Sequence, residues 1–183
     1  RTTLHFAAMN GHFAVVKYLV QEGKVDVSVR DNLENTPLHF AALKGCLDAV
    51  KCLIEEGKSD VFAGNVSGAT PLHYAAKRGH LDIVKYLIQE CKANVDARRH
   101  NQVTPLHNAA KRGQLSIVKY LIEDCKAEVD AVDNDYNTPL THAALKGYFE
   151  VVKYLVQECK ANVNIRDRFN FSIFKHIVLV MSI

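Results

Sequence analysis

The sequence predicts an α-solenoid, a stack of helix-turn-helix units joined by β-hairpin-like fingers. Its main evidence is a repeat of 34 residues, seen in the Thr-Pro-Leu motifs that begin at Thr36, Thr70, Thr104 and Thr138. Ala-Ala pairs and glycines recur in the same phase, and 48% of the chain is hydrophobic, as in an ordinary globular domain. A fixed period of this length indicates supersecondary units that bury their apolar faces against one another.

Each unit begins with a short helix, as residues 104–113 illustrate. Thr104 is a good N-cap and Pro105 suits the first helical position. Small apolar residues give this helix one buried face, and Gly113 ends it because glycine tolerates a left-handed conformation. After the turn, aliphatic residues at helical spacing in 115–122 predict a second helix, and the polar stretch 129–137 predicts an extended connection with a turn.

These motifs, TPLHFAALKG, TPLHYAAKRG and TPLHNAAKRG, resemble the ankyrin repeat. The resemblance implies an L-shaped unit of a β-hairpin and two antiparallel helices, stacked into a curved solenoid. It also implies that the histidines in the motif hydrogen-bond neighbouring backbone and the threonine hydroxyl. Ankyrin-repeat proteins bind partner proteins on a concave face formed by the finger tips and the first helices.

The period departs from the usual 33 residues of this family. Gly23 and Gly57 stand where the family ends its second helix, but Cys91, Cys125 and Cys159 take that position later. We therefore expect the later second helices to run slightly longer. The repeat domain is expected to span 1–171, with repeats at about 1–35, 36–69, 70–103, 104–137 and 138–171.

Residues 172–183 are apolar at helical spacing and lack the Ala-Ala pair. This tail is interpreted as a degenerate C-terminal repeat or a capping helix; alternatively, it is the exposed face of a truncated array. Its apolar character and the start at Arg1 lead us to expect a fragment of a longer protein. A monomer is expected, with dimerisation through the tail as the alternative.

Composition narrows the function classes. The net charge is only +3, and no apolar run approaches the roughly 18 residues of a membrane span. Five cysteines in a long chain favour a reducing compartment, so we expect the cytoplasm, with the nucleus as the alternative. There is no phosphate-binding loop, nucleophile elbow or metal-ligand spacing. We therefore expect neither enzyme activity nor a cofactor or metal.

The candidate binding residues are those that vary between units. Two residues precede each helix-ending glycine, and these pairs contain no acid. The residues chosen for electrostatic contact are basic members of these pairs and two arginines of the third finger, the one that joins the third and fourth units. They are Lys77, Arg78, Lys111, Arg112, Arg98 and Arg99. An equally weighted alternative is a solvated surface copied by duplication, because 75–97 and 109–131 are nearly identical.

Apolar residues are expected to supplement this charge. Aromatic and aliphatic side chains at finger tips and first helices suit interface anchors, and the chosen anchors are Tyr74, Leu43, Leu33 and Tyr136. Val103, just before a Thr-Pro-Leu motif, is expected to pack against the neighbouring finger instead.

The sequence therefore predicts a non-enzymatic adaptor or scaffold that binds a protein or peptide, with an acidic segment as the favoured target. Two alternatives remain open. The chain is the targeting arm of a larger enzyme, channel or effector, or it binds an anionic ligand such as nucleic acid or lipid. Nucleic acid is the weaker of these, since few aromatic residues interleave with the basic ones.

Overall fold

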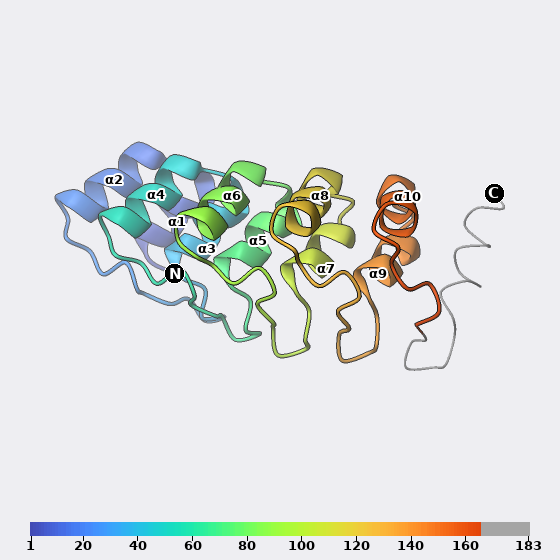
Figure 1. Ribbon diagram of the computed structural model, residues 1–183. Coiled ribbons are helices and arrows are strands. Elements are labelled where there is room, and N and C mark those ends of the chain that lie inside the picture. Colours follow the sequence, from blue (N-terminus) through green and yellow to red (C-terminus); the bar gives the residue numbers. More distant parts are fainter. Residues whose placement is uncertain (166–183) are drawn as a thin grey trace.

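The structure is a computed structural model in which residues 1–165 are described. This part of the chain forms five antiparallel helix pairs stacked in sequence order (Figure 1). The first helices lie side by side in one layer, the second helices form the other, and the fingers hang from one edge. The helices are α1 (Thr3–Asn10), α2 (Phe13–Gln21), α3 (Pro37–Lys44), α4 (Leu47–Glu55), α5 (Pro71–Arg78), α6 (Leu81–Gln89), α7 (Pro105–Ala110), α8 (Leu115–Glu123), α9 (Pro139–Leu145) and α10 (Phe149–Gln157).

A threonine and a histidine begin the first helices, as the third unit shows. The ring Nδ1 of His73 lies 2.9 Å from Thr70 Oγ1 and accepts the Thr70 backbone N–H at 3.2 Å. Its Nε2 lies 3.1 Å from the carbonyl oxygen of Val103 at the base of the next finger. One imidazole therefore caps its own helix and ties it to the following unit, which confirms the expected structural role.

The second helices do not lengthen along the chain, so that expectation is wrong. All five contain nine residues and end in the same phase. The left-handed residue of the turn is the lysine after the Gly or Cys position, such as Lys58 and Lys92, each with φ of 58°. Its ammonium also donates to a carbonyl of the helix end, at 2.6 Å for Lys92 and Gln89. The residue before this lysine is glycine in the first two units and cysteine in the last three, and this difference leaves the turn unchanged.

The core runs continuously through both helix layers. Alanine pairs of successive first helices are buried, which lets these helices pack closely. Leu87 and its equivalents Leu53, Leu121 and Leu155 are fully buried beneath them, whereas Leu19 of the first unit is partly buried. Each unit therefore depends on its neighbours for the burial of its apolar face.

The fingers are turns rather than β-hairpins within residues 1–165, where no strand is present. Successive fingers share one backbone hydrogen bond each, such as His100 N–H to Ser67 O at 3.0 Å. One such bond is too few for a strand ladder. Val103 is buried at the finger base. The expectations for residues 172–183 lie outside the described residues.

Candidate functional site

Cationic side chains gather where α5 and α7 end. Lys77 and Arg78 form the last turn of α5, and Lys111 and Arg112 directly follow α7. Burial lowers the pKa of the half-buried Lys77, and Arg112, Arg78, Arg99 and Lys111 lower it further by repulsion. These five residues, Lys77, Arg78, Arg99, Lys111 and Arg112, are called the basic patch below. None of them forms a salt bridge within the described residues.

The structure does not bring Arg98 into this patch. Its Nη2 donates to Glu128 Oε2 at 2.7 Å, and its Nη1 donates to the Val132 carbonyl at 3.4 Å. Arg98 therefore faces the fourth finger. Arg99 instead donates from Nη2 to Ser67 Oγ at 2.8 Å, while its buried Nε has no hydrogen-bond partner within the described part of the chain.

The four apolar candidates do not form one surface. Leu33 and Tyr136 are 55% and 58% exposed, but they lie on the first and fourth fingers. Leu43 is partly buried against the core. Tyr74 is half-buried, its ring lies edge-on to His39 at 5.6 Å, and its hydroxyl donates to Asn35 Oδ1 at 2.9 Å. Of these four, Tyr74 shares a cavity lining with Lys77 and Arg99 of the basic patch.

A small cavity of about 70 Å³ opens beside the patch. None of its lining residues is acidic. His73 is neutral there, because burial lowers its pKa to about 4. Asn108 stands in phase with Tyr74 in the sequence but was not among the chosen binding residues. The lining residues are Ala69, His73, Tyr74, Lys77, Arg99 and Asn108.

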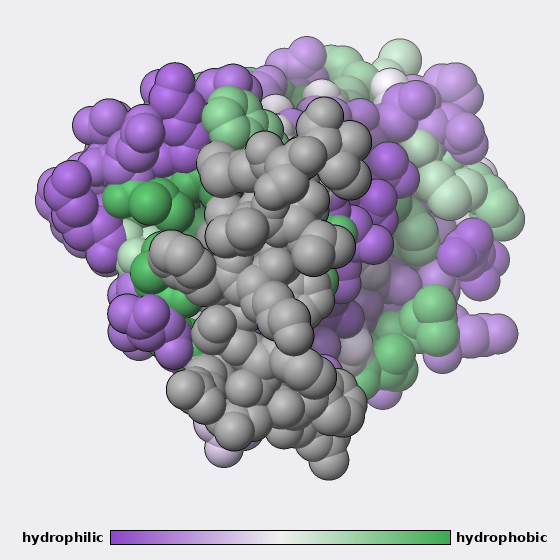
Figure 2. All heavy atoms as spheres, turned by 90° about the vertical axis from the view of Figure 1, so that its right-hand side faces the viewer, coloured by the Kyte–Doolittle hydropathy of each residue, from purple (hydrophilic) through white to green (hydrophobic). Residues whose placement is uncertain are grey.

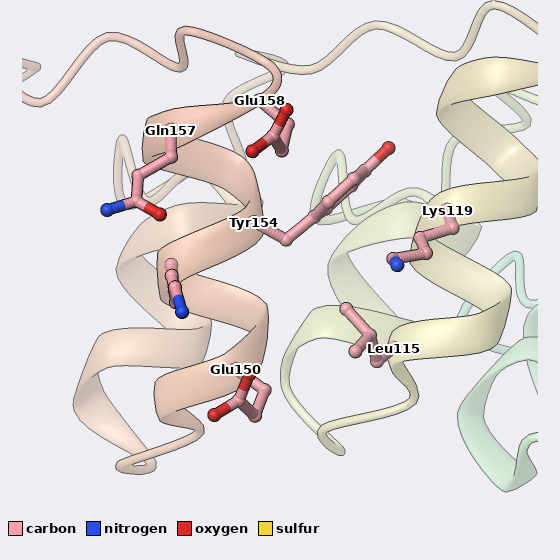
Figure 3. Close-up of a pocket in the computed structure, with 7 residues that line it drawn as sticks. Leu115, Lys119, Glu150, Tyr154, Gln157 and Glu158 are labelled. Carbon is pink, nitrogen blue, oxygen red and sulfur yellow. The ribbon is translucent and has the colours of Figure 1, made fainter.

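A second cavity, of about 150 Å³, lies between α8 and α10 in the layer of second helices (Figure 3). Lys119 and Tyr154 face each other there, with the ammonium 5.3 Å from the ring centroid. Because the same stacking recurs at the equivalent pairs of the two preceding units, it holds successive second helices together. The cavity also contains Glu150 and Glu158, so its charges are mixed.

Viewed from the C-terminal end of the stack, hydrophilic residues prevail and hydrophobic ones form separate areas (Figure 2). No cluster of three or more His, Cys, Asp or Glu residues within 1–165 could hold a metal ion. None of the described helices has the length and apolarity to cross a bilayer.

Five stacked helix pairs of common phase define a tandem-repeat solenoid. The chain belongs to the ankyrin-repeat family, since the family model described as Ankyrin repeats (3 copies) matches residues 4–99 and 91–167. Ankyrin repeats generally mediate protein–protein interaction, and the family is typically non-enzymatic. A search of curated proteins found no match to the chain.

Proposed function

We propose that this chain is a non-enzymatic adaptor that captures an acidic segment of a partner protein on its basic patch. The supporting observation is the concentration of cations at the ends of α5 and α7, none in an internal salt bridge within 1–165. A rigid, preformed surface lowers the ordering cost of binding, and the patch steers an acidic segment toward it. We also propose a cytoplasmic location, with the nucleus as the alternative, because five cysteines in a long chain favour a reducing compartment.

Affinity capture from cell lysate tests this proposal, with Arg78→Glu/Arg112→Glu as the charge-reversed variant. Both residues are exposed, so the reversal leaves the core intact. Exposed ion pairs contribute about 0.2–1 kcal/mol each, and the double reversal changes four units of charge. Capture of the specific partner should therefore weaken roughly tenfold or more.

The matched control is Lys17→Glu/Lys153→Glu, which makes the same change of charge at exposed positions on α2 and α10. Its capture should equal that of the parent. If both variants lose the partner equally, the patch has no specific role and net charge alone governs binding. If neither loses it, binding lies on the fingers or elsewhere.

A nuclease-treated lysate separates protein capture from nucleic-acid capture. Binding that disappears on nuclease treatment, or that falls steeply with salt whatever the sequence of an added oligonucleotide, would assign the patch to nucleic acid instead.

A further inference from the structure

One position of the finger normally carries an acceptor oxygen. Asp31, Asn65 and Asp133 occupy the same position of the 34-residue repeat, at the start of the finger turn. In each, Oδ1 accepts the backbone N–H groups two and four residues later, at 2.9–3.1 Å. This side chain closes its own turn, which is the ordinary role of Asp and Asn in such loops.

The third finger breaks this pattern, because Arg99 occupies the position. A guanidinium has only donors, so it cannot accept the two backbone N–H groups. The third finger therefore keeps the backbone hydrogen bonds of the turn, such as Arg99 N–H to Val103 O at 3.1 Å, but gives up the two that this side chain accepts in the other described fingers. A residue that breaks a local rule without a local gain marks a position under a functional demand.

The same position also meets the next unit. Asn65 donates to the Tyr74 hydroxyl at 3.1 Å, and Asp133 accepts from His142 at 2.9 Å. The corresponding pair in the third unit is Arg99 and Asn108, which line the same cavity. Neither of these two residues is a carboxylate, whereas the fourth finger supplies Asp133 at this position.

The cavity therefore offers two cations, Lys77 and Arg99, and no carboxylate to pair with them. Arg99 Nε is buried and unpartnered within the described residues, and Asn108 Nδ2 makes only a long hydrogen bond of 3.3 Å to the His73 carbonyl. Lys77 completes the wall. Lys77 and Arg99 are half-buried cations without a counter-charge among the lining residues, and partial burial of an unpaired charge is unfavourable. A volume of about 70 Å³ exceeds the room needed by one water molecule, so a small anionic group can enter.

We propose that this cavity is a carboxylate subsite, which takes one Asp or Glu side chain of the bound partner between Arg99 Nε, Lys77 and Asn108. The proposal rests on the proposed function and adds to it the residue class that anchors the acidic segment. A carboxylate is favoured over a phosphate because a planar carboxylate or carboxamide fills the equivalent position of the other fingers. An anion in the cavity would also favour the charged form of Lys77, against the burial and repulsion that lower its pKa.

The test is an NMR titration of the full chain, observing the arginine Nε–Hε signals. The probe is N-acetyl-glutamate methylamide, with N-acetyl-glutamine methylamide as its neutral counterpart. The glutamate probe should shift the Arg99 signal saturably while the Arg30 signal, from the first finger, stays in place. The glutamine probe should leave both unchanged.

Variants locate the contacts. Lys77→Gln should weaken glutamate binding about tenfold, as expected for one charge-assisted hydrogen bond. Lys44→Gln removes an equal charge from the end of α3, outside the cavity, and should change binding less than threefold. Arg99→Lys keeps the charge but removes Nε, and should abolish saturable binding; Arg30→Lys is its matched control. Circular dichroism establishes whether each variant is folded. If Arg99→Lys is not folded, the titration of the parent chain with the two probes tests the proposal by itself.

Three results would overturn the proposal: no Arg99 shift with the glutamate probe, an equal shift with the glutamine probe, or tighter saturation by methyl phosphate. The last would assign the cavity to a phosphate group. Failure of the proposed function gives a different result, namely a specific Arg99 shift without any captured partner. Conversely, capture that is sensitive to Arg78→Glu/Arg112→Glu but not to Lys77→Gln would retain the function and remove the subsite.

Discussion

Acidification should unfold this protein between pH 6.5 and pH 4, because three of the capping histidines are buried and neutral. Burial is the largest cause that lowers the pKa values of His39, His73 and His107, each to about 4. The geometry agrees with this direction. Each Nδ1 accepts the backbone N–H of its capping threonine, so a proton on Nδ1 would face another donor and disrupt the cap.

The sign and size follow from proton linkage. The usual histidine pKa is 6.5, so the unfolded chain binds more protons below that value and stability falls as the pH falls. The contribution is fully present above pH 6.5 and is lost progressively down to pH 4. At pH 5 each histidine costs about 2 kcal/mol of unfolding free energy, or about 6 kcal/mol for the three. Domains of this size have about 5–15 kcal/mol in total, so the stack should be partly or fully unfolded there.

The fifth unit provides the control substitution. There Thr141 replaces the histidine, and its Oγ1 still accepts the Thr138 backbone N–H at 3.2 Å. His107→Thr should therefore keep a cap but lose the bond to the Asn137 carbonyl, lowering stability at pH 7 by about 1–3 kcal/mol. It should also lose about 2 kcal/mol less than the parent between pH 7 and pH 5.

Urea unfolding followed by circular dichroism at pH 7, 6 and 5 measures this dependence, and NMR titration of the imidazole signals reports the pKa values directly. An unfolding free energy that is unchanged from pH 7 to pH 5 would refute buried neutral histidines. So would a His107→Thr variant with the parent's pH dependence.

Two further predictions concern packing. Gly113→Ala should destabilise the stack by over 1 kcal/mol in thermal or urea unfolding, because a methyl there would meet the Tyr148 ring at a left-handed position. Gly147→Ala has a similar φ, 72°, but open space around it, so it should cost less; equal losses would contradict the proposed clash. Iodoacetamide should modify Cys52 last among the five cysteines, since Cys52 is 4% exposed and burial raises the pKa of its thiol. Early modification of Cys52 in the native protein would show that α4 opens readily.

The repeat, the helix starts and the structural histidines were predictable because they depend on local sequence. Thr104 and Pro105 specify a helix start through capping and backbone geometry alone, and the 34-residue phase carries that conclusion to every unit. The prediction of longer second helices failed for a local reason. The residue that adopts the left-handed conformation is Lys92 rather than Cys91, and lysine has no strong preference for it.

The basic patch was found from sequence because Lys77, Arg78, Lys111 and Arg112 share a phase that places them at adjacent helix ends. The different contacts of Arg98 and Arg99 were not predictable from the order of these residues in the chain. The two residues are neighbours on one finger, yet one reaches forward to Glu128 and the other back to Ser67. The pattern Asp31, Asn65, Arg99, Asp133 could have singled out Arg99, but only the structure shows what that exchange leaves unpaired.

The sequence by itself determined the architecture, because a repeated pattern of caps, small residues and aliphatic residues allows each unit to bury its apolar face only against the next. Tertiary structure decided which charges remain available to a partner. That outcome depends on side-chain contacts between units about 30 residues apart, such as Arg98 with Glu128. Such contacts form only when stacking sets the distance and direction between neighbouring fingers, and no local preference in the sequence encodes them.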